Sequence, residues 1–221
     1  MKIAALVSGG KDSLYASYLA SKEHELVCLV SLKSKNTASY MFHVPNIELT
    51  KLQAGAIGLP IIFKETKGEK EKELKDLKKA IEFAVDKYAA EGLVSGALYS
   101  EYQKKRIDNI CKELGIKSLA PLWHRDAEEY LKELVKAGFE VIITAIAAEG
   151  LDKSYLGAKI DKNMIEKLKT KNINIAFEGG EAETFVLKCP LFNKKIEIKR
   201  AKIKMEKEYI GQYIIEDAVL A

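Results

Sequence analysis

A glycine-rich segment near the start of the 221-residue chain combines residue types that bind anions. Residues 8–13 read SGGKDS, directly after the apolar run 3–7 and directly before a helical pattern. Paired glycines let the backbone approach a ligand, while free N–H groups and the positive end of a helix dipole face the same place. Two serines and one lysine add donors. The segment therefore predicts a phosphate-binding loop, with a plain structural turn as the alternative.

The loop also carries one carboxylate, that of Asp12. In this position Asp12 either caps the following helix or holds Mg²⁺ against phosphate oxygens. The loop matches neither the GxxxxGKS/T pattern of mononucleotide-binding loops nor the GxGxxG pattern of dinucleotide-binding loops. Both of those classes are therefore disfavoured.

A second polar segment, residues 178–184, reads EGGEAET and leads into the apolar run 185–187. Its three carboxylates, on Glu178, Glu181 and Glu183, repel one another and are costly to hold together unless a cation or a donor lies between them. The segment therefore predicts a site for Mg²⁺, an ammonium ion or a cationic substrate. A solvent-exposed acidic turn is the alternative.

Two further segments place polar residues where ligands bind. A polar stretch that ends in MFHVPN is too long for an ordinary strand-to-helix loop, so His43 is a candidate ligand contact. The block SGALYSEYQKKR follows a predicted strand and opens a helix, on which Gln103 and Arg106 share one face. Gly96 in this block would let adenine or ribose approach the backbone. The alternatives are a structural histidine and an ordinary surface arginine.

These segments need a scaffold that brings them together. The first 120 residues alternate strand-like and helix-like segments, which is the pattern of a parallel sheet with crossover helices. Ligands bind beyond the carboxyl ends of the strands in such sheets. The predicted strands are 2–7, 26–32, 60–64 and 93–95, and the predicted helices are 11–22, 47–57 with Asn46 as its cap, 69–90 and 101–114.

The pattern changes after Pro121-Leu122-Trp123. Asp126 and Glu129 form a capping box before a helix that ends at Gly138. The segments that follow are a strand at 139–145, a helix at 161–171 and three alternating runs near 184–188, 195–204 and 209–216. We therefore expect two domains, residues 1–120 and residues 121–221, of which the second is smaller and mixed α/β.

Composition limits the partners and the location that we expect. The net charge of +4 is small and forms no basic stripe, so nucleic acid is not an expected partner. The longest apolar runs fall far short of the roughly 18 residues of a membrane span, and the N-terminus lacks a signal-peptide pattern, so we expect a cytoplasmic protein without membrane contact. Cys28, Cys111 and Cys189 lack metal-ligand spacing, and we expect them to be buried and free.

Taken together, the motifs resemble those of a known family. SGGKDS after an N-terminal strand resembles the pyrophosphate loop of the N-type ATP pyrophosphatases, a group of adenylating enzymes. With MFHVPN, SGALYSEYQKKR, PLW and EGGEAETFV, the chain resembles the diphthine–ammonia ligase family from residue 1 to about 190. Many relatives carry an aromatic residue where this chain has Ala182, a difference that bears on substrate packing.

The resemblance implies a HUP-type (Rossmann-like) nucleotide-binding domain, followed by a family-specific domain that recognises the acceptor. It also implies ATP-dependent amidation of diphthine, a modified histidine on translation elongation factor 2, by ammonia. The reaction would pass through an acyl-adenylate, use Mg²⁺ and release AMP and pyrophosphate. The implied site residues are Lys11, Asp12 and Glu183 for catalysis, with Asp12 also as metal ligand; Ser8, Gly9, Gly10, Asp12, Ser13 and Gly96 for ATP binding; and His43, Gln103, Arg106, Glu178, Glu181 and Thr184 for contact with acceptor or nucleotide.

Two other functions fit part of the sequence. A tRNA-modifying adenylating enzyme would share the phosphate loop, but thiolation usually needs reactive cysteines, and the chain lacks a strong basic face. A non-catalytic module that senses ATP or AMP would keep the glycine-rich loop but have no use for the acidic segment. The sequence is compatible with a homo-oligomer.

Overall fold

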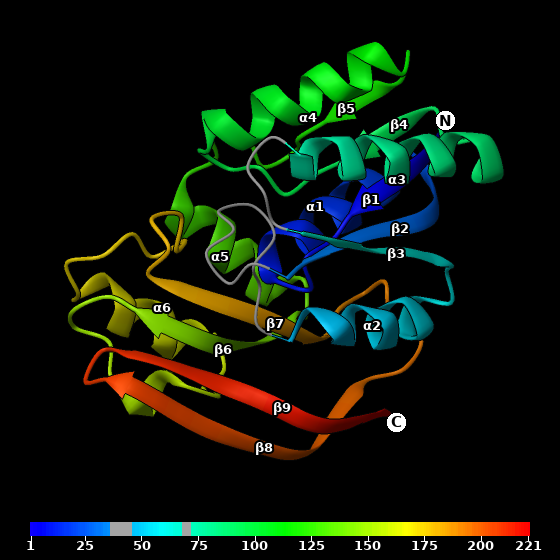
Figure 1. Ribbon diagram of the computed structural model, residues 1–221. Coiled ribbons are helices and arrows are strands. Elements are labelled where there is room, and N and C mark those ends of the chain that lie inside the picture. The colour runs from blue at the N-terminus through cyan, green and yellow to red at the C-terminus, as the bar shows by residue number, and fades with distance from the viewer. Residues whose placement is uncertain (36–45, 68–71) are drawn as a thin grey trace.

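The computed structural model of the protein describes residues 1–35, 46–67 and 72–221. Two β-sheets, called sheet A and sheet B, lie one above the other, with helices between them and further helices on the outer face of sheet A (Figure 1). The strands of sheet A come from the first half of the chain, and those of sheet B come from the second half.

Sheet A is parallel, and its described strands follow the order β3-β2-β1-β4-β5. The strand order reverses between β1 and β4, and ligands of doubly wound folds bind beyond the carboxyl ends of the strands at such a point. The strands are β1 (Lys2–Leu6), β2 (Glu25–Ser34), β3 (Ile61–Thr66), β4 (Gly92–Val94) and β5 (Lys117–Leu119). The helices of this half are α1 (Lys11–Ser21), α2 (Thr50–Ile57), α3 (Lys72–Tyr88) and α4 (Glu101–Glu113), with a short 3₁₀ helix at Ile47–Leu49.

Sheet B is antiparallel, and its described strands follow the order β7-β6-β9-β8. Its strands are β6 (Glu140–Ala147), β7 (Ala182–Lys188), β8 (Ile196–Lys207) and β9 (Ile210–Leu220). Helices α5 (Ala127–Lys136) and α6 (Lys162–Lys169) belong to the same half, as does a 3₁₀ helix at Lys153–Tyr155. The parallel sheet with a mixed α/β second half confirms the fold class expected from the sequence.

One hydrophobic core fills the space between the two sheets. Buried side chains of β1 and α1, such as Ile3 and Leu14, belong to the same cluster as Tyr130 of α5, Ile143 of β6 and Val186 of β7. A second cluster joins the other face of sheet A to α3 and α4. Neither half of the chain covers the first apolar surface by itself, so burial of this surface holds the two sheets together.

Asn46 stands at the predicted N-cap position, but its side chain does not cap the helix. It precedes the 3₁₀ helix with φ 65°, and its side chain makes no capping hydrogen bond. The side-chain amide instead donates to the carbonyl oxygen of Tyr213 at 3.1 Å and accepts from the N–H of Ile215 at 2.9 Å. Pairing with two backbone groups of β9 therefore outcompetes the local cap, and it fixes the start of α2 against sheet B.

The other local predictions have mixed outcomes. Asp126 caps α5 as expected, because its carboxylate accepts from the N–H of Glu129 at 2.9 Å. The edge strand β5 was not predicted, since its three residues carry no alternating pattern. Cys28, Cys111 and Cys189 are buried and free, as expected.

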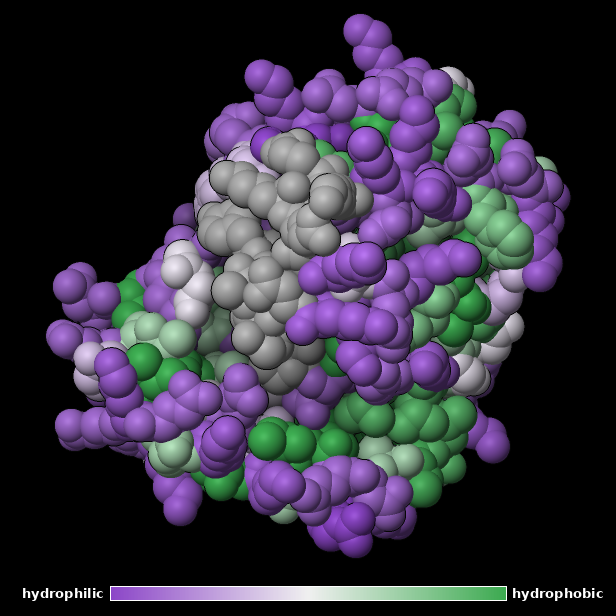
Figure 2. Space-filling model, in the orientation of Figure 1, coloured by the Kyte–Doolittle hydropathy of each residue, from purple (hydrophilic) through white to green (hydrophobic). Residues whose placement is uncertain are grey.

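The visible face of the molecule is mainly polar (Figure 2). Hydrophilic side chains predominate on the face shown in Figure 2, including the region of α3 and α4. Among the described helices, none is both long enough and apolar enough to cross a membrane.

Gly96 provides a test of how closely the first and fourth strand-to-helix loops pack. A Cβ at this position would lie 2.6 Å from both the carbonyl carbon of Asp12 and the backbone nitrogen of Ser13. Because backbone atoms of α1 cannot yield as a flexible side chain does, Gly96→Ala should lower the free energy of unfolding by about 2 kcal/mol in urea denaturation.

Gly55→Ala is the matched control for that substitution. A Cβ at Gly55 would contact only Leu220 Cδ1 at 3.3 Å, and alanine is the better residue inside a helix. Its free energy of unfolding should stay within about 1 kcal/mol of the unmodified chain. Equal stabilities of the two variants would contradict the close packing at Gly96.

Candidate functional site

A cavity of about 320 Å³ lies at the reversal point of sheet A, between the two halves of the chain. The phosphate loop and the loop after β4 contribute from the first half, and the acidic segment before β7 contributes from the second. The described lining residues are Leu6, Val7, Ser8, Gly10, Lys11, Asp12, Ser13, Leu32, Ile47, Ser95, Gly96, Ala97, Ser100, Gln103, Ile107, Phe177, Glu178, Gly179, Gly180, Ala182, Glu183 and Thr184.

The glycine-rich loop forms a compact turn at the start of α1. Gly9 has φ +87°, a backbone conformation that favours glycine. The Ser13 hydroxyl accepts from the N–H of Ser8 at 3.2 Å and donates to the carbonyl oxygen of Gly10 at 3.1 Å. Helix α1 then begins at Lys11 without a side-chain cap, and residues of its first turn line the cavity, so the positive end of its dipole lies at the cavity wall.

Strand β7 holds this loop from the other half of the chain. The carbonyl oxygen of Gly9 accepts from the N–H of Val186 at 3.0 Å and from Nε2 of Gln53 at 3.0 Å. Gln53 Nε2 also donates to the carbonyl oxygen of Val186 at 2.9 Å, and the N–H of Lys11 donates to Thr184 Oγ1 at 3.1 Å. The shape of the phosphate loop therefore depends on residues that lie far away in the sequence.

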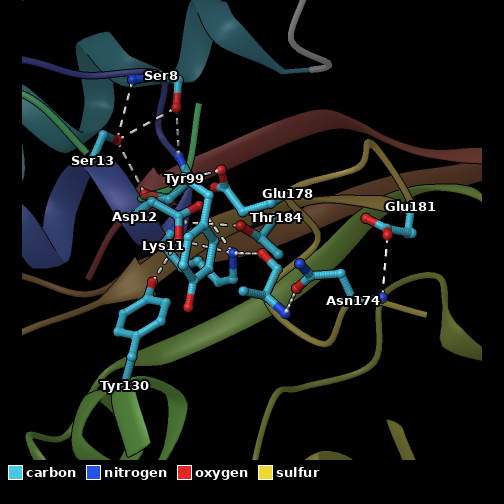
Figure 3. Close-up of polar contacts among 12 residues, drawn as sticks. Ser8, Lys11, Asp12, Ser13, Tyr99, Tyr130, Asn174, Glu178, Glu181 and Thr184 are labelled. Atoms are coloured by element: carbon cyan, nitrogen blue, oxygen red, sulfur yellow. Dashed lines mark hydrogen bonds and ion pairs between the residues drawn. The ribbon is translucent and has the colours of Figure 1, made fainter. Parts of the chain in front are cut away.

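An ion pair between the buried Lys11 and the partly exposed Asp12 lies beneath the loop (Figure 3). Lys11 Nζ contacts both carboxylate oxygens of Asp12 at 2.9 Å and donates to the carbonyl oxygen of Ala176 at 2.6 Å. The hydroxyl of Tyr130 donates to Asp12 Oδ1 at 2.7 Å. Burial of the ring and the nearby Asp12 charge raise the pKa of Tyr130 well above its ordinary value, so its hydroxyl stays a neutral donor.

Asp12 makes no capping hydrogen bond, so the cap expected as one alternative is absent, and the metal-ligand role stays a prediction. Mg²⁺ commonly takes one or two carboxylates and completes its shell with phosphate oxygens and water. No group of three or more histidine, cysteine, aspartate or glutamate side chains suited to a metal was found in the described part of the chain. Asp12 fits this role as one protein ligand beside a bound triphosphate.

Two of the three acidic-segment carboxylates point toward the cavity. Burial is the main cause that raises the pKa of Glu178, with the Asp12 charge adding to it, and the Glu178 carboxylate accepts from the N–H of Tyr99 at 3.2 Å. Burial likewise raises the pKa of Glu183 to about 7, since the Asp12 and Glu178 charges offset the opposing effect of Lys11. A carboxylate with such a pKa exchanges protons near neutral pH.

Glu181 lies apart from Glu178 in Figure 3 and is not among the described residues that line the cavity. Its oxygens accept from the backbone N–H groups of Asn174 at 3.2 Å and Gly179 at 2.8 Å. The side chain therefore closes the turn that presents Glu178, and in this structure it does not reach the phosphate loop.

Only some of the remaining candidate residues line the cavity. Gln103 lines the cavity, whereas the guanidinium of Arg106 lies over the ring of Tyr102, 3.5 Å from its centroid. Gly9 turns its carbonyl oxygen toward β7 and is not among the described lining residues. His43 falls outside the described residues.

Sequence reasoning missed several residues that shape the site. Tyr130, Gln53 and Phe177 were assigned no role, although they contact Asp12, Gly9 and the Lys11 ammonium respectively. Tyr130 lies on the apolar face of a predicted helix, where an aromatic residue is indistinguishable from ordinary core. The one signal for Gln53 was a long polar side chain near the middle of a predicted helix.

Removal of the Tyr130 hydroxyl tests its bond to Asp12. Tyr130→Phe should lower the free energy of unfolding by about 2 kcal/mol, because the hydroxyl of a fully buried ring loses its bond to a charged acceptor. Tyr15→Phe is the comparison, since its hydroxyl donates to the partly exposed Glu133 at 3.1 Å and Arg125 still pairs with that carboxylate. Tyr15→Phe should lower the free energy of unfolding by about 1 kcal/mol or less. An equal or smaller effect of Tyr130→Phe in urea denaturation would contradict a role for this bond in holding Asp12.

The raised pKa of Glu183 predicts a pH-dependent effect on stability. The folded chain favours the neutral carboxyl, so its contribution is fully present below the ordinary pKa of 4.5 and is lost as pH rises toward about 7. Glu183→Gln is neutral throughout, so its melting temperature relative to the unmodified chain should rise between pH 4 and pH 8. The exposed Glu149→Gln serves as control and should show no such trend. A constant difference for Glu183→Gln across this range would show that Glu183 is not held in a desolvated site.

Family models and curated proteins that match the chain identify its relatives. The family model of the diphthamide synthase N-terminal domain matches residues 1–118, and that of the diphthamide synthase C-terminal domain matches residues 126–221. The chain is 34% identical to the diphthine–ammonia ligase of Homo sapiens over 92% of this chain and 85% of that protein. It is 35% identical to the Rattus norvegicus diphthine–ammonia ligase over 90% of this chain and 83% of that protein.

Two solved structures resemble the chain at lower sequence identity than these relatives. One is described as a predicted subunit of tRNA methyltransferase from Methanocaldococcus jannaschii, with a TM-score of 0.45 and 18% identity over 86% of this chain and 98% of that chain. The other is the U34-tRNA thiolase NcsA from Methanococcus maripaludis, with a TM-score of 0.39 and 16% identity over 62% of this chain and 57% of that chain. The matched family models and the curated relatives confirm the family expected from the sequence: the chain belongs to the diphthamide synthase family.

Proposed function

We propose that the chain catalyses the ATP-dependent amidation of diphthine on translation elongation factor 2, with ammonia as nitrogen donor. The products are diphthamide, AMP and pyrophosphate. The observation that carries the proposal is that one cavity joins the phosphate loop to the Glu178 and Glu183 carboxylates in a member of this family. The phosphates of ATP and the ammonium ion that supplies nitrogen can then bind in the same cavity.

The first half supplies the nucleotide site. The phosphates of ATP bind at the start of α1, where the loop hydroxyls, backbone N–H groups and the Lys11 ammonium provide donors. The nucleoside lies along the loop after β4, where the backbone of Gly96 and the side chains of Gln103 and Ile107 line the cavity. Asp12 would hold Mg²⁺, which neutralises phosphate charge when it is bound.

In the first step the chain aligns the acceptor carboxylate with the α-phosphorus of ATP. A carboxylate oxygen forms a bond to this phosphorus while the bond to the pyrophosphate oxygen breaks, which gives an acyl-adenylate and pyrophosphate. Lys11 and the N-terminus of α1 stabilise the negative charge that collects on the leaving pyrophosphate. Activation is required because the oxygen of a free carboxylate is a poor leaving group.

In the second step the carboxylates of the acidic segment deliver ammonia. An ammonium ion binds between Glu178 and Glu183, and Glu183 accepts one of its protons. The pKa of about 7 suits a base that works near neutral pH. The nitrogen lone pair then attacks the acyl carbon, AMP leaves, and the nitrogen releases a second proton to solvent to give the amide.

In this proposal residues 1–120 bind nucleotide and residues 121–221 recognise the acceptor. The reaction takes place in the cytoplasm, where translation occurs. The buried cysteines argue against a persulfide-based thiolation of tRNA, because burial raises the pKa of Cys28 to about 12, of Cys111 to about 11 and of Cys189 to about 12. Such thiols do not ionise readily at neutral pH.

A direct assay tests the proposal. The chain is incubated with ATP, Mg²⁺, ammonium and elongation factor 2 that carries diphthine, and the mass of the factor and the release of AMP are measured. We expect amide formation with one AMP per amide, and Glu183→Gln should lower kcat by about 100-fold. Glu149→Gln is the control and should retain full activity. AMP release only with tRNA, or no ATP turnover with either acceptor, would contradict the proposal.

A further inference from the structure

A second, smaller cavity adjoins the nucleotide cavity. Its volume is about 200 Å³, and Gly180, Ala182 and Glu183 line both cavities. The two spaces therefore border the same segment, the one that leads into β7. The other described residues that line the smaller cavity are Ala145, Ile146, Ala147, Glu206, Ile210, Gly211 and Gln212.

The register of sheet B places the lining side chains. Ala145 pairs with Glu183 of β7 on one side and with Gln212 of β9 on the other, so these three side chains share one face of the sheet. Ala147 pairs with Ile210 and lies on the same face two residues further along. Small alanine side chains leave the space that a larger residue would fill.

The chemistry of this cavity is that of a site for an apolar cation. Ala145, Ala147 and Ile210 offer methyl surface, and Glu183 and Glu206 provide negative charge. No lysine or arginine is among its described lining residues. A quaternary ammonium group has no N–H donor to satisfy, so it is stabilised by apolar contact beside carboxylates rather than by hydrogen bonds.

The volume of the nucleotide cavity and the geometry of attack at phosphorus both favour a separate route by which the acceptor reaches the reaction centre. A volume of about 320 Å³ is at the lower limit for a small-molecule site, so ATP leaves little room in the nucleotide cavity for an acceptor side chain. In displacement at phosphorus the attacking and leaving oxygens lie roughly in line. The acceptor therefore approaches from a side that the pyrophosphate does not occupy.

We propose that the smaller cavity binds the trimethylammonium group of the acceptor side chain while its carboxylate passes Glu183 into the nucleotide cavity. This inference rests on the proposed function, because diphthine supplies a side chain with both groups. Glu183 stands at the junction of the two cavities, so it is positioned to contact the cationic carbon chain and the incoming ammonium in turn.

Two substitutions outside the nucleotide cavity test this assignment. Ala147→Leu fills the smaller cavity from an exposed position, and Glu206→Gln removes one of its charges without changing its size. Ala147→Leu should raise the KM for elongation factor 2 about tenfold, and Glu206→Gln should raise it about threefold. Both should leave the Kd for ATP, measured by calorimetry without acceptor, within about twofold of the unmodified chain. Glu208→Gln, an equally exposed carboxylate in the turn after β8 that does not line the cavity, is the matched control and should change neither quantity.

Tetramethylammonium chloride serves as a small probe of the same cavity. It should inhibit amidation competitively against elongation factor 2 and not against ATP, compared with equal sodium chloride, and Ala147→Leu should abolish this inhibition. Unchanged KM values in both variants, or inhibition that competes with ATP, would overturn the assignment while leaving the proposed function intact. If the unmodified chain fails to amidate the factor, the proposed function fails, and the acceptor role of the cavity fails with it.

Discussion

The hydrogen bonds between the phosphate loop and β7 are the contacts on which the rest of the site depends. The Gly9 carbonyl is held by Val186 and Gln53, and the Lys11 N–H is held by Thr184. These bonds fix the loop that starts α1, and the same strand is preceded by the acidic segment. The contact between the phosphate loop and β7 therefore determines both the shape of the loop and the position of the acidic segment. A shift of β7 would disturb both.

Much of the fold and part of the candidate site could be predicted, because their signals are local. The alternation of strands and helices, the SGGKDS turn and the capping pattern at Asp126 each depend on neighbouring residues. The pairing of Asn46 with β9, the bond from Tyr130 to Asp12 and the bridge made by Gln53 depend on segments more than 40 residues apart. Such contacts follow from tertiary packing, and no spacing in a single sequence reports them.

The acidic groups of the site carry an electrostatic cost that the structure reduces in two ways. The Lys11 ammonium and the Tyr130 hydroxyl both bond to the Asp12 carboxylate, while Glu178 and Glu183 are desolvated and their pKa values rise. The sequence shows one carboxylate in SGGKDS and three in EGGEAET, but only the fold distinguishes Asp12, the turn-closing Glu181 and the two carboxylates that face the cavity.

The phosphate loop and its hydrogen-bond partners in β7 lie far apart in the sequence, and this separation matters during protein synthesis. Lys11 and its partner Thr184 are 173 positions apart, so the loop lacks its partners while most of the chain is still being synthesised. Translation at roughly 5–20 residues per second delays this closure by many seconds after the glycine-rich segment has emerged. An unfinished chain that already contains every residue of sheet A thus has the nucleotide motif without its final shape, and competence to handle ATP arises late in biosynthesis.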